Sequence, residues 1–243
     1  MVALSTCPGA GSAATSAAAA TAAAAGGAAA ARPKAVASRC PGATAAVTEA
    51  FIAADCAACW GAPADPAAAQ PASPRRAAAA AWRLDWITPA GPGADMAAAA
   101  LPEAAERQAR VAAAGTATPA AKASSAPRGW VIEAQSGPAW HQYLGLQFGL
   151  RPKPGAAALP AGSTGWLALV EEVPAGTEGT AQARWLVRAL AGPLPLAATR
   201  PTTHLQAFRM PETSRVDRLV ARAWVEAPDG RILWMAADRC AAR

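Results

Sequence analysis

The sequence predicts an α+β protein, with a mixed helix and strand part followed by a β-rich part. Two observations carry this prediction. Strand and helix patterns alternate between residues 46 and 114, as expected for parallel strands with helical crossovers. From Ser163 onward, short apolar runs separated by turn residues take over, which is typical of antiparallel strands. The first part is expected to cover residues 43–150 and the second residues 151–243.

The first predicted strand leads into the most informative motif of the chain. Val47–Ile52 has a strand pattern, and Cys56 and Cys59 follow within a few residues. Two cysteines three positions apart share one helical turn and lie close enough to form a disulfide. A strand that runs into C-x-x-C at a helix start is the thioredoxin-like redox arrangement. The helix expected over residues 57–70 is interrupted or shortened by prolines, namely Pro63, Pro66 and Pro71.

Further elements complete the predicted N-terminal part. Ala80–Ile87 reads as a second strand, closed by Thr88-Pro89. Pro102–Ala114 is the clearest helix, because it has proline first, glutamates early, arginines later and Gly115 as a stop. Trp130–Glu133 adds a short strand. The order strand, helix, strand, helix therefore predicts a thioredoxin-like unit with a parallel strand pair.

The C-terminal part is predicted to be antiparallel β. Trp166–Val170 and Ala183–Arg188 have the apolar composition of strands. Leu219–Glu226 and Arg231–Met235 flank Ala227-Pro228-Asp229-Gly230. This turn sequence predicts a hairpin between the last two strands.

The core is expected to depend on residues other than alanine. Alanine supplies most of the 53% hydrophobic fraction but buries little area. Nine tryptophans stand against three phenylalanines and one tyrosine. We expect these tryptophans to fill the core of an alanine-diluted fold, and an aromatic binding groove is the alternative.

Residues 1–42 are nearly all Ala, Gly, Ser, Thr and Pro. Such a segment buries too little apolar surface to offset the entropy of ordering, so a disordered tail is predicted. A degenerate export signal and a misplaced start codon are the other two interpretations. Alanine is too weakly apolar to make Ala13–Ala31 a membrane span. With the cysteines, the export interpretation leads us to expect a periplasmic or secreted protein.

Composition and motifs argue against several functions. The net charge is +6 and the pI about 9.5, but the basic residues are dispersed, so nucleic-acid binding is not expected. Zinc binding is not expected either, because the chain has no second C-x-x-C and His141 and His204 are far apart. Neither a nucleophile elbow nor a phosphate-binding or dinucleotide-binding glycine motif is present. We expect no metal and no cofactor.

Several segments match a known family in order and spacing. The matching segments of the first part are Glu49-Ala50-Phe51-Ile52, Cys56-Ala57-Ala58-Cys59, Pro63-Ala64-Asp65, Trp82-Arg83-Leu84-Asp85-Trp86, Glu106-Arg107-Gln108 and Thr118-Pro119. Those of the second part are Leu167–Val170, Val187–Leu190 and Asp229–Leu233. Over roughly residues 45–238 the chain thereby resembles the secreted, thioredoxin-like bacterial family called domain of unknown function 1223. Trp60 departs from the family, which usually has proline there, so the chain resembles a divergent member.

The resemblance implies thiol–disulfide exchange or redox sensing. In a site of this kind Cys56 attacks as the thiolate and Cys59 resolves the mixed disulfide. Thr118-Pro119 would be a cis peptide bond that faces Cys56. The partner would be an unidentified thiol or disulfide protein. The alternative is a non-catalytic thioredoxin-like interaction or structural module in which the cysteine pair is inert.

Cys40 and Cys240 are the candidates for a structural bridge, because they flank the region expected to be ordered. Closing so long a loop stabilises a protein by roughly 4–5 kcal/mol in the chain-entropy model. A bridge of this kind would indicate an oxidising compartment.

Overall fold

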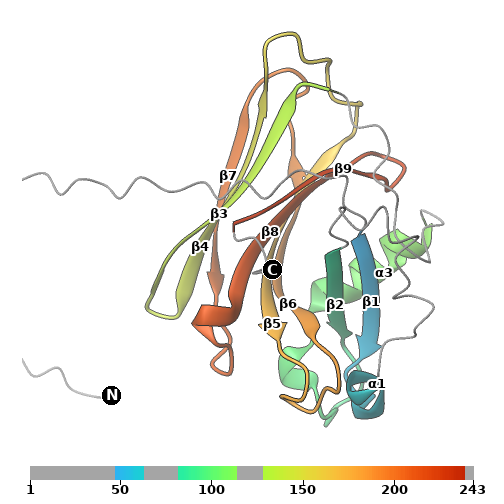
Figure 1. The fold of residues 1–243 in the computed structure, drawn as a ribbon. Coiled ribbons are helices and arrows are strands. Elements are labelled where there is room, and N and C mark those ends of the chain that lie inside the picture. Colours follow the sequence, from blue (N-terminus) through green and yellow to red (C-terminus); the bar gives the residue numbers. More distant parts are fainter. Residues whose placement is uncertain (1–46, 63–81, 114–127, 239–243) are drawn as a thin grey trace, which may run out of the picture. The chain divides into compact units, whose positions relative to one another are not determined.

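Strands dominate the part of the chain that the computed structural model describes, namely residues 47–62, 82–113 and 128–238. The chain divides into two units, Met1–Val36 and Ala37–Arg243, and every described residue lies in the second. The described strands form one six-stranded sheet and one three-stranded sheet (Figure 1).

The six-stranded sheet joins a parallel edge to an antiparallel body. Its strands are, in spatial order, β1 (Val47–Ala53), β2 (Trp82–Thr88), β6 (Arg184–Pro195), β5 (Thr164–Val173), β8 (Leu219–Glu226) and β9 (Ile232–Ala237). β1, β2 and β6 run parallel, and the other neighbours are antiparallel. The junction is short, because the register of β2 and β6 has the single pair Asp85 and Leu186.

The second sheet is antiparallel throughout. It consists of β3 (Trp130–Trp140), β4 (Tyr143–Pro152) and β7 (Thr202–Arg209). The described helical segments are α1 (Ala57–Gly61), α3 (Pro102–Ala113) and the 3-10 turns η2 (Ala97–Ala99) and η3 (Val216–Arg218). Over the described ranges, no helix has the length and apolar character needed to cross a bilayer.

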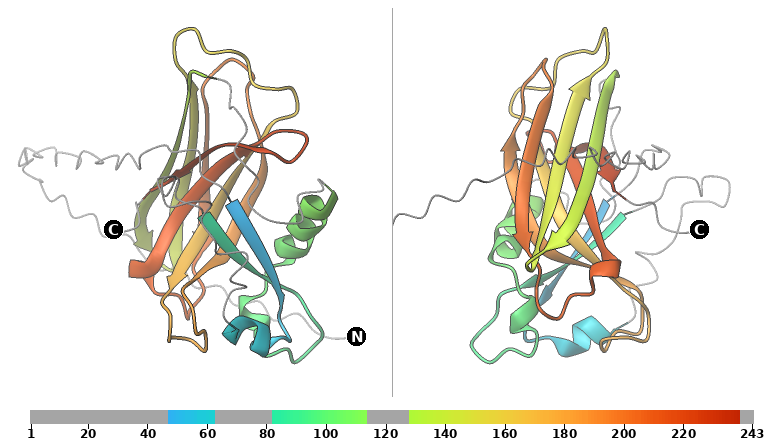
Figure 2. Two further views of the ribbon diagram at one scale, coloured as in Figure 1. Left: turned by 45° about the vertical axis from the view of Figure 1, so that its right-hand side comes forward. Right: turned by 90° about the vertical axis from the view of Figure 1, so that its left-hand side faces the viewer.

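The alternation of side chains along β5 divides the core into two layers. Leu167 and Leu169 pack with Phe148 of β4, between the two sheets. Trp166 points to the opposite face and packs with Ala104 of α3. Because successive side chains of a strand point to opposite faces, a strand between two packed layers is buried on both. β5 is such a strand, because all but two of its residues are buried. Figure 2 shows the second sheet on one side of the six-stranded sheet and α3 on the other.

A buried cation connects α3 to the sheet. Arg107, which is 3% exposed, donates to Glu49 of β1 with 2.6 Å between Nη2 and Oε1. It also donates to Glu226 of β8, with 2.5 Å between Nη1 and Oε2. Burial opposes the charge of Arg107, but the hydrogen bonds and charges of the two glutamates raise its pKa. The Arg107 guanidinium further lies over the ring of Trp166, 5.2 Å from its centroid.

Most tryptophans contribute to the core, as expected. The buried ones are Trp60, Trp86, Trp130, Trp166 and Trp224. Trp140, at the turn between β3 and β4, is the exception, because 73% of its surface is exposed.

The expected α+β class with a thioredoxin-like N-terminal part is wrong. Apart from the five residues of α1 and the twelve of α3, regular structure in the described residues is almost entirely β. β1 and β2 do not form an α/β unit of their own, because β2 pairs with β6 on its other side and β3 belongs to the other sheet. The local pattern of strand, helix, strand, helix was present, but its strands join a sheet built by the later part of the chain. The boundary expected between residues 150 and 151 lies inside β4.

Several single elements agree with the sequence. The hairpin around Asp229-Gly230 is confirmed, since β8 and β9 pair antiparallel on either side of it. The helix expected over Pro102–Ala114 is present as α3. The expected tail (residues 1–42), the bridge between Cys40 and Cys240, and the cis bond at Thr118-Pro119 fall outside the described residues.

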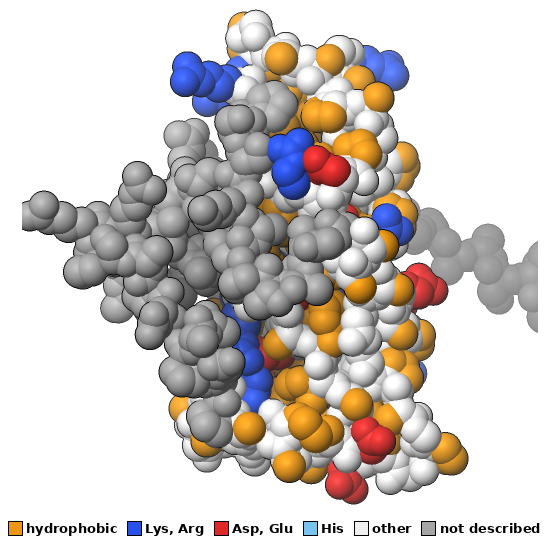
Figure 3. Space-filling model, turned by 90° about the vertical axis from the view of Figure 1, so that its right-hand side faces the viewer, with side chains coloured by type: hydrophobic (Ala, Val, Ile, Leu, Met, Phe, Trp, Pro, Cys, Tyr) orange, Lys and Arg blue, Asp and Glu red, His pale blue; other side chains and the backbone are white. Residues whose placement is uncertain are grey.

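Charge does not mark a binding region on the face drawn in Figure 3. The Lys, Arg, Asp and Glu side chains of the described residues are scattered there among hydrophobic and uncharged groups. The cysteine pair and the buried charges, and not a charged patch on this face, are therefore the features that define a candidate site.

Candidate functional site

Cys56 and Cys59 form a disulfide at the turn that follows β1. Their Cα atoms are 5.2 Å apart, within the usual range for a disulfide. The backbone N–H of Cys59 donates to Sγ of Cys56 over 3.3 Å. Cys56 is partly buried and Cys59 is exposed. The structure thus brings the two predicted cysteines together at the protein surface.

Backbone hydrogen bonds define the path from β1 into α1. The N–H of Cys56 donates to the carbonyl of Ala53 over 2.9 Å, which closes the turn after the strand. Ala54 is fully buried and donates to the carbonyl of Thr88 at the end of β2 over 3.0 Å. The hydroxyl of Thr88 donates in turn to the carbonyl of Ile52 over 3.3 Å. The cysteine turn is therefore fixed on its N-terminal side by β2.

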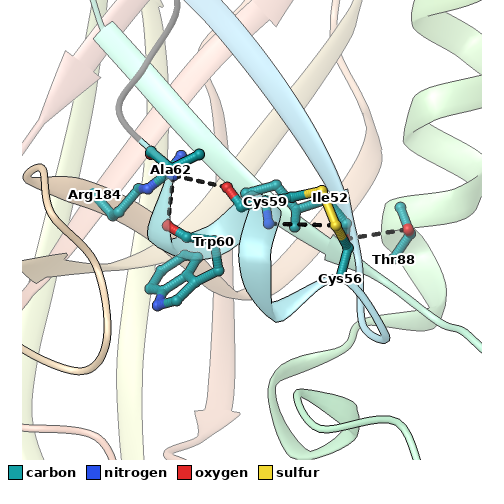
Figure 4. The surroundings of a disulfide bond; sticks show 7 residues. All are labelled: Ile52, Cys56, Cys59, Trp60, Ala62, Thr88 and Arg184. Carbon is teal, nitrogen blue, oxygen red and sulfur yellow. Dashed lines mark hydrogen bonds between the residues drawn. A yellow bond between two sulfur atoms is a disulfide. The ribbon is translucent and has the colours of Figure 1, made fainter.

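Arg184 holds the other end of α1. Its Nη2 donates to the carbonyl oxygens of Cys59, Trp60 and Ala62, over 3.1, 2.6 and 3.0 Å. The last carbonyls of a helix have no partner within the helix, and Arg184 satisfies them here. Figure 4 shows Arg184 and the Trp60 indole on the side of α1 away from the disulfide.

Asp85 is the counter-charge of Arg184 in the interior. This fully buried residue of β2 lies with Oδ1 3.1 Å from Nη1 of Arg184. The same oxygen is 2.8 Å from Nη2 of Arg83, and Oδ2 accepts from the N–H of Trp185 over 2.9 Å. Buried charges require such partners. The network therefore links β2, β6 and the cysteine turn.

The loop between β5 and β6 also contacts α1. The indole N–H of Trp60 donates to the carbonyl of Glu178 over 2.8 Å, and the Gln182 amide donates to the carbonyl of Ala62 over 3.1 Å. A cavity of about 230 Å³ opens beside Trp60. Its apolar lining includes Ile87, Met96, Ala99 and Leu186. Neither cysteine lines this cavity, so it lies beside the cysteine turn and not at the disulfide.

The sequence identified two residues of this site and missed its support. The spacing of Cys56 and Cys59 identifies the pair, whereas nothing in the sequence connects Arg184 with it. One signal was available: Asp85 and Arg184 are charged residues within apolar strands, and buried charges imply a partner. Within the described ranges no group of three or more His, Cys, Asp or Glu side chains is placed to hold a metal ion.

Fold and site together define a mainly β protein with a surface C-x-x-C disulfide at the parallel edge of its larger sheet. No family model and no curated protein sequence matches the chain. Among solved structures the chain is similar to HBP35 of Porphyromonas gingivalis, with a TM-score of 0.51 and 9% identity over 80% of this chain and 74% of that one. A domain of the outer membrane lipoprotein Omp28 from Porphyromonas gingivalis matches with a TM-score of 0.34 and 15% identity, over 48% of this chain and 92% of that one. At such identities similarity concerns the fold alone, and the function has to be argued from the site.

Proposed function

We propose that Cys56 and Cys59 carry out thiol–disulfide exchange with a protein partner in an extracytoplasmic compartment. One observation carries the proposal: the two cysteines are joined at the surface, and a backbone N–H points at Sγ of Cys56. The thiolate is the nucleophile in exchange, and the N–H of Cys59 is placed to donate to Sγ of Cys56. Cys56 is accordingly the attacking residue and Cys59 the resolving one.

The reaction passes two electrons between the chain and its partner. The Cys56 thiolate attacks a disulfide sulfur of the partner, a bond between the two proteins forms, and one partner thiolate leaves. The Cys59 thiolate then attacks Sγ of Cys56, which restores the intramolecular disulfide and releases the second partner thiolate. The partner is reduced and the cysteine pair oxidised, and in the reverse direction the partner dithiol is oxidised.

The location is part of the same proposal. Disulfides form and persist in oxidising compartments, and the Cys56–Cys59 disulfide is consistent with one. Membership of the family of domain of unknown function 1223 is likewise proposed on the matching segments alone. In cells, a membrane-impermeant alkylating reagent should label Cys56 and Cys59 after mild reduction, while a cytosolic marker stays unlabelled. Labelling only after lysis would contradict the location.

Exchange is tested by redox titration and by trapping. Across a series of glutathione buffers, mass spectrometry should show the pair convert between dithiol and disulfide in one two-electron step. The wild-type chain should reduce insulin, Cys56→Ser should not, and Cys59→Ser should accumulate a mixed disulfide at Cys56. A pair that stays oxidised in every buffer, with no insulin reduction above Cys56→Ser, would show the inert disulfide of a structural module instead.

A further inference from the structure

Helix α1 is too short to be stable by itself. It has five residues, Ala57–Gly61, and isolated helices need about 12–15 residues before they are even marginally stable in water. Its geometry therefore depends on what it contacts. The disulfide closes one side of the turn, and Arg184 binds the carbonyl end. The polar contacts at that end that do not depend on the disulfide include those made by Arg184, Gln182 and Trp60.

Arg184 is itself held in place. Its side chain is 3% exposed. Nη1 is paired with Asp85, and Nε donates to Oγ1 of Thr180 over 3.3 Å. Nη2 donates to three carbonyl oxygens of the α1 region. The guanidinium also lies over the Trp60 ring, 5.2 Å from its centroid. Nη1 and Nε are thus held by residues outside α1, so the position of Arg184 does not depend on the disulfide alone.

We propose that Arg184 is the positioning residue of the Cys56–Cys59 pair, and this inference rests on the proposed function. It keeps the two thiols of the reduced protein in the geometry of the disulfide, and thereby sets their effective concentration toward each other. Arg184 acts on the pair through its hydrogen bonds to the carbonyl oxygens of Cys59, Trp60 and Ala62, so its proposed action is geometric. We therefore expect that replacing the Arg184 side chain makes the disulfide easier to reduce.

The test measures the equilibrium between the pair and glutathione. Oxidised glutathione and the protein dithiol give the protein disulfide and two reduced glutathione molecules, so sulfur, protons and electrons balance. With Arg184→Met, we expect the equilibrium constant for closing the disulfide to fall about tenfold, which is about 30 mV in reduction potential for a two-electron couple. Arg184→Lys keeps the charge and one hydrogen bond, and should recover part of this loss.

Arg188→Met is the matched control. Arg188 lies on the same strand, is also buried, and pairs with one carboxylate, with 2.6 Å between its Nε and Oε2 of Glu171. It makes no hydrogen bond to α1. A variant that destabilises the oxidised and reduced proteins equally leaves the equilibrium constant unchanged, so Arg188→Met should stay within twofold of wild type. An unchanged constant in Arg184→Met, or an equal fall in Arg188→Met, would overturn the inference.

A second measurement does not depend on the folding of any Arg184 variant. The N–H groups of Trp60 and Ala62 donate to the carbonyl oxygens of Cys56 and Ala58, over 3.2 and 2.9 Å. In the wild-type protein under reducing conditions these amides should remain protected from hydrogen exchange. Rapid exchange on reduction would show that the disulfide alone holds the turn, and would overturn the inference. The equilibrium with glutathione is measured without insulin. A chain that exchanges with glutathione but reduces no insulin would count against exchange with a protein partner and leave the role of Arg184 standing.

Discussion

The guanidinium of Arg184 meets the carboxylate of Asp85 at 3.1 Å, although 99 residues separate them in the chain. Asp85 also accepts from Arg83 and from the N–H of Trp185. This convergence occurs where the register of β2 and β6 has a single residue pair. Side-chain contacts thus strengthen the junction between the parallel edge and the antiparallel body.

Asp85→Asn should strongly destabilise the protein. It leaves Arg184 buried without its counter-charge, and breaking a buried pair by removing one partner costs about 3–5 kcal/mol. Urea denaturation gives the free energy of unfolding. Glu133→Gln is the control, because its ion pair with Arg151 is exposed and should be worth about 0–1 kcal/mol. Equal losses in the two variants would contradict the structural role of Asp85.

Arg107→Met should cost far more stability than Arg222→Met. The first leaves Glu49 and Glu226 buried without their cation, at about 3–5 kcal/mol. Arg222 forms no ion pair with a carboxylate of the described residues; it donates to the carbonyl of Arg83 over 2.7 Å and lies over the Trp185 ring. Replacing Arg222 leaves no carboxylate buried without its cation, so the loss of stability should be much smaller. Because Arg107 and Arg222 are 3% and 4% exposed, equal losses in paired urea titrations would show that burial alone sets the cost.

The cost of burying Arg222 should diminish at high pH. Burial lowers the pKa of Arg222 to about 10, below its value in the unfolded chain. Above that pH the unfolded state binds more protons than the folded state, so the free energy of unfolding rises with pH through this group. From about pH 9 to about pH 11, the free energy of unfolding of wild type should therefore rise relative to that of Arg222→Met. A difference that is flat with pH would show that Arg222 keeps its ordinary pKa.

Gly192→Ala should disturb the packing of Trp166 and Trp224, which lie in one core layer with Ala104 of α3. Gly192 has a φ of 149°, and an added Cβ would overlap the indole of Trp166, with 2.9 Å to Cδ2. Trp166 is 3% exposed and stacks on Trp224, so it has no room to move. Overpacking of this kind costs about 1–3 kcal/mol, and the backbone conformation adds to it. The added Cβ of Gly145→Ala meets nothing within 4 Å, and that variant should be within about 0.5 kcal/mol of wild type. Urea denaturation and near-ultraviolet circular dichroism would measure both.

Local structure could be predicted from the sequence where local chemistry determines it. Pro102 marks the start of α3, and Asp229-Gly230 marks the hairpin. The spacing of Cys56 and Cys59 identified the pair, because a contact between residues three apart needs no knowledge of the remaining chain.

The pairing of distant strands could not be predicted in the same way. β2 pairs with β6, which lies about a hundred positions later in the chain. Nothing in the pattern of either strand indicates that the two are neighbours. The thioredoxin-like interpretation failed for this reason, since the strand, helix, strand order near Cys56 fits more than one sheet. The role of Arg184 could not be predicted, because it depends on contacts with Cys59 and Asp85, which are distant in the sequence.

The long sequence separation between the cysteine turn and its support has a consequence for biosynthesis. Arg184 lies 125 residues after Cys59, and a chain is synthesised from its N-terminus. The two thiols therefore emerge well before the strand that holds their turn. Until β6 is made, the carbonyl oxygens of Cys59, Trp60 and Ala62 lack the Arg184 hydrogen bonds that they have in the folded protein. The support of the cysteine turn is therefore complete only when the C-terminal half of the sheet has been made.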